Sequence, residues 1–404
     1  MRRETVALRA AAVGALLVQC AVLVASAVHT ATAGDAASSS DYAASWFGAS
    51  AWRSAGPSHA YDFTAQAALY SQVTHGVAGA WAHPFTWAPL SLLLALPVSL
   101  LPLPAAFSVW GLLQAMFIAV SAVIAVRASA VRDTRMRLAA VAVAFAGAGT
   151  VATILFGQWD GLPALELAVA YALWRRGAEI PAAAVLCVAM LSGKPQLALA
   201  LGAFVIGRSL WRGAAGLTIG GVVTALVSLA LVGSGGIAGW LHTLGITATV
   251  DPSGSISVFG LAADVMGNGP AAQVLATLAA VVLIAMGWML GRASRQPAGL
   301  EVCLLGATCA SLVASPHLFV QDLALLTPVF AAVLMRIHDR RTVAVIAWLA
   351  LVLAAEYQIL PFGSERPDAL VPLLLLAAMG FALVTGAGAS ARGRLGVPAG
   401  VAQR

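Results

Sequence analysis

Three polar residues of this 404-residue chain are of types that catalyse group transfer: Asp41, Lys194 and His317. A carboxylate such as Asp41 can take the proton of an attacking hydroxyl group. The compact ammonium group of a lysine suits a phosphate, and an imidazole can donate a hydrogen bond to the same phosphate. Together these groups indicate a general base and groups that could bind a phosphate.

Asp41 opens a predicted helix, and the three serines before it could cap that helix. One interpretation is that the carboxylate only complements the positive end of the helix dipole. The other is that Asp41 is a general base at the mouth of an outward-facing cavity. In that case Tyr42, Trp46 and Trp52 would hold it against the membrane surface.

Lys194 is the only lysine of the chain, and it lies between two apolar segments rather than in a basic loop. A charged group at that depth costs about 3 kcal/mol on insertion scales, so a functional role is the default expectation. The alternative is a lysine whose long side chain reaches the membrane interface. A functional Lys194 would bind the phosphate of the donor.

His317 follows Ser315-Pro316, with Asp322 further along the chain. It is either a satisfied polar residue or a catalytic group that contacts the leaving phosphate. Asp322 would orient His317 or would cap the helix that follows.

Further candidates for substrate binding lie next to these residues in the sequence. Gln158 belongs to the short turn Gly157-Gln158-Trp159-Asp160, which could also be a plain turn with an interfacial tryptophan. The substrate-binding candidates are Tyr42, Gln158, Gln196 and Asp322. The chemistry requires no metal and no ligand spacing is visible, although the sequence leaves a divalent metal open.

The composition identifies the class of protein that must position these residues. With 61% hydrophobic and only 9% charged residues, the chain is expected to be an all-α polytopic membrane protein. The net charge of +6 comes from arginines in the gaps between apolar runs, which indicates cytoplasmic loops rather than nucleic-acid binding. No nucleotide-binding loop is present, so a donor is expected to come from the membrane.

The apolar runs predict twelve membrane helices in a single domain over 1–404, with both ends cytoplasmic. Their ranges are 8–30, 105–126, 138–155, 161–174, 181–193, 196–208, 214–233, 272–290, 299–314, 319–335, 342–356 and 369–388. A cleaved signal peptide is the alternative for the first. The proline-rich segment 84–102 is expected to be re-entrant or surface-lying, within a first extracytoplasmic loop over 31–104. A second long extracytoplasmic loop is expected over 234–271.

The order and spacing of several short motifs resemble glycosyltransferase family 87 over roughly residues 35–335. The first group is Asp41-Tyr42, Gly56, Tyr61-Asp62, His83-Pro84-Phe85 and Leu96-Pro97. The second group is Phe156-Gly157-Gln158, Lys194-Pro195-Gln196, and Ser315-Pro316-His317 with Asp322. The run Trp87-Ala88-Pro89 departs from the expected proline pair.

The resemblance implies a GT-C fold with an outward-facing cavity in the cell membrane. It implies an inverting enzyme that takes its sugar from a polyprenyl phosphate and passes it to a glycolipid or lipid-linked glycan. Family members include an actinobacterial mannosyltransferase that extends phosphatidylinositol mannosides with α-1,2-linked mannose, and an arabinofuranosyltransferase. A transporter or lipid flippase and a non-catalytic subunit of an envelope complex remain as alternatives of other classes.

Overall fold

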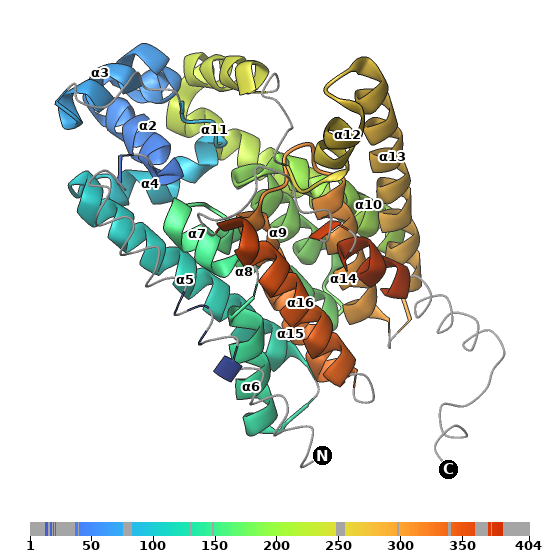
Figure 1. Ribbon diagram of the computed structural model, residues 1–404. Helices are drawn as coiled ribbons and strands as arrows, with labels where there is room; N and C mark the ends of the chain where they lie inside the picture. Colours follow the sequence, from blue (N-terminus) through green and yellow to red (C-terminus); the bar gives the residue numbers. More distant parts are fainter. Residues whose placement is uncertain are drawn as a thin grey trace, which may run out of the picture.

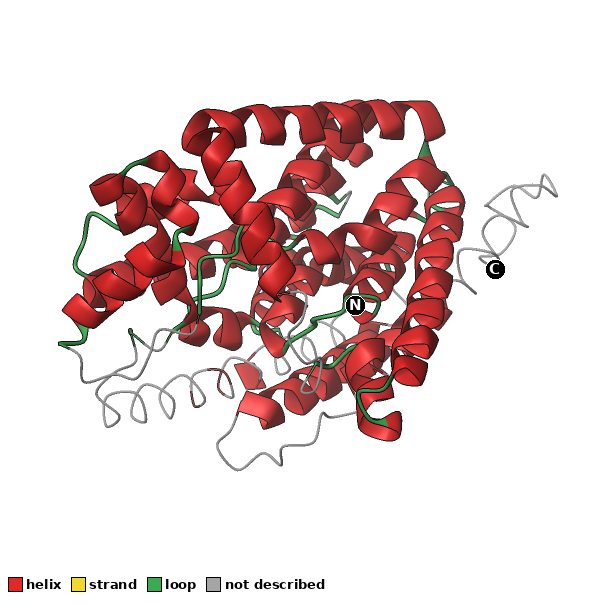
Figure 2. Cartoon of the chain, turned by 90° about the horizontal axis from the view of Figure 1, so that it is seen from above, coloured by secondary structure: helices red, strands yellow, loops and turns green. Residues whose placement is uncertain are grey.

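The computed structural model describes residues 13–14, 17, 19, 21, 37–38, 40–75, 83–129, 131–147, 149–247, 255–296, 299–337, 341–359, 371–372 and 374–382. Within these residues every regular element is helical and none is a β-strand (Figures 1 and 2). The prediction of an all-α protein with apolar membrane helices is therefore confirmed at this level.

The N-terminal region forms a group of short helices at one end of the molecule (blue in Figure 1). They are α2 (Asp41–Ala55), η1 (Pro57–Tyr61), α3 (Phe63–Val73), η2 (Pro89–Ser91) and α4 (Leu92–Val98). Their own apolar core includes Phe47 and Phe85, and it continues into Trp110 and Trp159 of the main bundle. Helix α4 has only seven residues, about a third of the length that a membrane crossing needs. Whether it is re-entrant or lies on the surface stays a prediction.

The remaining helices form the main bundle. They are α5 (Leu103–Ala128), α6 (Thr134–Phe145), α7 (Thr150–Phe156), α8 (Gly161–Arg175), α9 (Glu179–Ser192), η3 (Pro195–Ala198), α10 (Leu199–Arg208), α11 (Leu210–Thr247), α12 (Val258–Met266), α13 (Pro270–Ala293), α14 (Leu300–Val313), η4 (Val320–Leu325), α15 (Leu326–Arg336) and α16 (Arg341–Ile359). Nearly every residue of α14 and α15 is buried. These two helices therefore lie at the centre of the bundle.

The structure does not support twelve spans. Among the described residues, three helices are long and apolar enough to cross a membrane: α5, α11 and α13. Helices α6 and α7 make a fourth if the pair, bent by 50°, is one span. Several other expected spans are helices of 10 to 15 residues, shorter than the 20 or so that a crossing needs. The expected span at 8–30 lies largely outside the described residues, and of the span expected at 369–388 the structure describes 371–372 and 374–382, which are helical.

Much of the segment 234–271, where a long extracytoplasmic loop is expected, is helical. Helix α11 bends at Gly233, whose φ of 66° and ψ of 180° are not helical, and it then continues to Thr247. A second helix, α12, follows at 258–266. The continuation of α11 is held against the N-terminal helices, because Trp240 Nε1 donates to the carbonyl of Thr86 over 3.1 Å.

The turn between α7 and α8 depends on a glycine. Gly157 has a φ of +69°, and a Cβ there would lie 2.5 Å from Cβ of Tyr42. Gly177 has a similar φ of +76° but nothing within 4 Å of an added Cβ. We expect Gly177→Ala to cost about 1 kcal/mol from backbone strain and Gly157→Ala to cost a further 1–3 kcal/mol from the clash. Unfolding curves of the purified variants would measure the difference, and equal stabilities would contradict it.

Candidate active site

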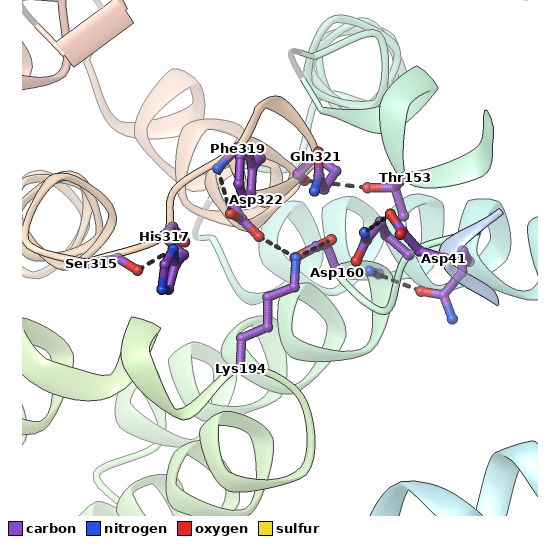
Figure 3. Close-up of polar contacts among 12 residues, drawn as sticks. Asp41, Thr153, Asp160, Lys194, Ser315, His317, Phe319, Gln321 and Asp322 are labelled. Atoms are coloured by element: carbon purple, nitrogen blue, oxygen red, sulfur yellow. Dashed lines mark hydrogen bonds and ion pairs between the residues drawn. The ribbon is translucent and has the colours of Figure 1, made fainter. Parts of the chain in front are cut away.

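Four segments that are distant in sequence meet at one end of the bundle (Figure 3). They are the start of α2, the α7–α8 turn, the α9–η3 turn and the segment from the end of α14 into η4. The expected break of the helices at Lys194 is confirmed, since α9 ends at Ser192 and α10 begins at Leu199. Such irregular backbone at a membrane protein's interior is typical of a cavity or a site.

Lys194 forms an ion cluster with two buried carboxylates. Its Nζ lies 3.1 Å from both oxygens of Asp160, and it also pairs with Oδ1 of Asp322. The exposed fractions of the three side chains are 11% for Lys194, 2% for Asp160 and 1% for Asp322. Lys194 is thus buried and ion-paired. Its side chain does not extend to a membrane interface, which was the alternative expectation.

The two carboxylates lie at the starts of helices, Asp160 just before α8 and Asp322 in the first turn of η4. Asp160 is the N-cap residue of α8, but its side chain makes no capping bond and points to Lys194 instead. Asp322 accepts a hydrogen bond from the backbone N–H of Phe319 over 2.7 Å through Oδ2, while Oδ1 faces Lys194. Asp322 therefore caps the start of η4, which is one of the two roles expected for it. None of its hydrogen bonds reaches the ring of His317.

Asp41 lies beside this ion cluster at the first turn of α2. Its Oδ2 accepts a hydrogen bond from the side-chain amide of Gln158 over 2.5 Å. Gln158 is separated from Asp160 by one residue, so the α7–α8 turn carries both the partner of Asp41 and a member of the ion cluster. None of the ion pairs among the described residues involves Asp41. Its side chain is half-buried, so it can meet both solvent and a substrate.

Aromatic packing holds the turn that carries Gln158 and Asp160. Trp159 is fully buried against Trp110, and its Nε1 donates to Ser45 Oγ of α2 over 3.0 Å. The ring of Tyr42 stacks on Trp110 with centroids 5.1 Å apart and is 0% exposed. The expectation of an interfacial Trp159 and of Tyr42 at the membrane surface is therefore wrong. Both rings are core residues that position the two sides of the site.

His317 lies in the segment that follows α14. Its backbone carbonyl accepts a hydrogen bond from Ser315 Oγ over 3.0 Å, whereas its ring makes none with the described residues. Burial lowers the pKa of His317, although the charge of Asp322 acts in the opposite direction. The imidazole is consequently neutral near pH 7 and has one N–H to donate. Gln196 is half-buried and makes no side-chain hydrogen bond with the described residues.

The charges of the site differ from the sequence expectation in one respect. Two carboxylates face one ammonium group, so the ion cluster of Lys194, Asp160 and Asp322 carries a formal charge of −1. Lys194 is not free, and a phosphate could contact it only by exchanging with a carboxylate. Asp41 is the carboxylate of the site that no cation of the described residues neutralises. Asp160 was not among the candidate site residues predicted from the sequence. It is 34 residues from Lys194, and no sequence spacing predicts that contact.

The all-helical bundle and its buried ionic cluster define a membrane protein with a polar site at one end of its helices. A sequence model of glycosyltransferase family 87 matches residues 85–316, which is more than half of the chain. The chain belongs to this family, and it is therefore a glycosyltransferase. Gln158, Asp160 and Lys194 lie within the matched range, whereas Asp41 and Asp322 lie outside it. No curated protein and no solved structure matches the chain.

Proposed function

We propose that this glycosyltransferase moves mannose from a polyprenyl phosphate to a glycolipid on the outer face of the cell membrane, with an α-1,2 linkage. The observation that carries the proposal is the carboxylate of Asp41, which is half-exposed, held by Gln158 and paired with no cation in the described part of the chain. A carboxylate in that state can act as a general base. The chain also has no nucleotide-binding loop, which favours a donor supplied by the membrane.

The proposed reaction is a single displacement at the anomeric carbon of the sugar. The acceptor hydroxyl forms the new bond to that carbon while Asp41 takes its proton. The bond between the carbon and the phosphate oxygen breaks, and the electron pair leaves with the polyprenyl phosphate. Because attack and departure take place on opposite faces, the configuration inverts. The base and the groups that stabilise the phosphate must therefore lie on opposite sides of the sugar.

Lys194 and His317 are the proposed partners of the departing phosphate. The phosphate would replace one carboxylate as the partner of Lys194, so that the ammonium group keeps two anionic neighbours. The N–H of the neutral His317 would donate to a phosphate oxygen, and it makes no hydrogen bond with the described residues that would have to break first. Such prearranged donors stabilise developing charge at little reorganisation cost.

The test is sugar transfer by the purified protein in lipid. Polyprenyl-phosphate mannose and polyprenyl-phosphate arabinofuranose would be offered separately with a phosphatidylinositol mannoside acceptor. We expect transfer from the mannose donor and a product with inverted configuration relative to the donor. Transfer from the arabinose donor alone would overturn the proposed sugar, and a product with retained configuration would overturn the single displacement.

Replacing His317 with alanine is expected to lower turnover about 10²-fold, because one hydrogen bond to the leaving phosphate is lost. His242 of α11 is a matched control, since it is exposed and makes no hydrogen bond with the described residues. His242→Ala should leave turnover unchanged. Initial rates at saturating donor would measure both effects. Normal turnover in the His317→Ala protein would remove His317 from the proposed mechanism.

A further inference from the structure

A second polar site lies at the opposite end of the helices that carry the candidate active site. It is a cavity of about 250 Å³ lined by Ser129, Val131, Arg175, Glu301, Ala332, Met335 and Arg336. Arg175 ends α8, whose N-cap residue is Asp160, and the 15 residues between them span roughly 22 Å. Helices α14 and α15 likewise run from this cavity to the segment around Asp322 (Figure 1). The cavity is therefore separate from the active site.

The buried end of the cavity carries a carboxylate with unused hydrogen-bonding capacity. Glu301 is 2% exposed; its Oε1 accepts from the hydroxyl of Tyr171 over 3.0 Å and lies 3.3 Å from Nη1 of Arg175. Its Oε2 is buried and has no hydrogen-bond partner within the described part of the chain, and neither has Nε of Arg175. Buried polar atoms without partners are rare in proteins. Here an acceptor and a donor remain for a ligand.

The outer end of the cavity is positively charged. Arg336 is exposed at the last turn of α15 and takes part in none of the ion pairs among the described residues. Further arginines flank the lining residues in the chain: Arg127, Arg132 and Arg176. Two guanidinium groups and one carboxylate give the lining a net charge of +1. The cavity thus offers two cations for an anion and one acceptor for a hydroxyl group.

We propose that this cavity binds the phosphate and hydroxyl groups of a polyol phosphate. The phosphate lies between the guanidinium groups of Arg175 and Arg336, which suit phosphate geometry. A hydroxyl group of the polyol donates to Oε2 of Glu301. A simple anion would leave Oε2 of Glu301 without a hydrogen-bond donor, and a simple cation would be repelled by the arginines. The volume, equal to about eight waters, fits a small headgroup.

The same chemistry belongs to the headgroup of an anionic phospholipid and to a free polyol phosphate. The arginine-rich end of the bundle is the expected cytoplasmic end, where anionic lipids attract basic side chains. The inference is independent of the proposed sugar, acceptor and mechanism, because it concerns binding at the far end of α8, α14 and α15. Its failure and the failure of the proposed function are therefore distinguishable.

The test measures binding of fluorescent phosphatidylglycerol to the purified full-length protein in phosphatidylcholine nanodiscs. Phosphatidylmethanol has the same charge but no headgroup hydroxyl, so the wild-type protein should bind it more weakly. Arg336→Gln should weaken phosphatidylglycerol binding about tenfold, and Arg336→Glu should weaken it further. Arg212 is a matched control, because it is exposed at the start of α11 and does not line the cavity. Its glutamine and glutamate variants should bind as the wild type does.

Competition with glycerol 3-phosphate identifies the source of the ligand. If glycerol 3-phosphate displaces the fluorescent lipid at a concentration comparable to that of unlabelled phosphatidylglycerol, the cavity is assigned to a soluble polyol phosphate. If only unlabelled phosphatidylglycerol displaces it, the cavity is assigned to a lipid headgroup. Equal binding by the wild type and both Arg336 variants would overturn the proposal. Absence of saturable binding for both phosphatidylglycerol and glycerol 3-phosphate would overturn it as well.

Discussion

Replacing Asp41 with asparagine is expected to lower the turnover of sugar transfer by about 10² to 10⁴, because the proposed base is lost. Asparagine has nearly the same shape as aspartate, and its side-chain oxygen can still accept the 2.5 Å hydrogen bond from Gln158. It cannot take a proton from the acceptor hydroxyl. Donor binding should remain close to normal, since Asp41 does not contact the Lys194 cluster directly.

Asp62 offers a matched control for this substitution. It caps α3 by accepting hydrogen bonds from the N–H groups of Thr64 and Ala65, over 2.9 and 3.2 Å. Asparagine caps helices about as well as aspartate, so Asp62→Asn should keep the fold. Single-turnover rates and donor affinities of both variants would be compared with the wild type. Equal rates for Asp41→Asn and wild type would remove Asp41 from the mechanism.

The sequence predicted the positions of the helices better than it predicted which of them cross the membrane. The apolar runs correctly located most helices. The break at Lys194 was expected because a single crossing over 181–208 would leave Arg208 and Arg212 outside. The number of spans was not predictable in the same way. A short helix buried on every side, such as α14 or α15, is as apolar as one that faces lipid. Hydrophobicity therefore identified helices without showing which of them cross.

The candidate residues were recognised individually, but their pairing was not. Asp41, Lys194 and Asp322 were each named as candidate functional residues. The partners of Lys194 are 34 and 128 residues away, and no local pattern encodes a contact over that distance. Asp160 was read as part of a plain turn for this reason.

Replacing Lys194 with methionine is expected to destabilise the protein by about 3–5 kcal/mol, because two carboxylates are left buried without a cation. Asp160 and Asp322 are 2% and 1% exposed, so solvent cannot replace the ammonium group. The same variant should lose turnover if Lys194 also binds the donor phosphate. A single substitution cannot separate these two effects, because an unfolded protein is also inactive.

A triple variant separates them, in which Lys194→Met is combined with Asp160→Asn and Asp322→Asn. Removing all three charges of the ion cluster should recover most of the lost stability, since neutral replacement of a whole buried ion pair is often tolerated. Asparagine at 322 can still accept the bond from the N–H of Phe319. Unfolding curves would then show a stable protein, and transfer assays should show low turnover with weakened donor affinity. A triple variant that recovers both stability and turnover would assign the ion cluster to the fold alone, and Lys194 would have no part in holding the phosphate.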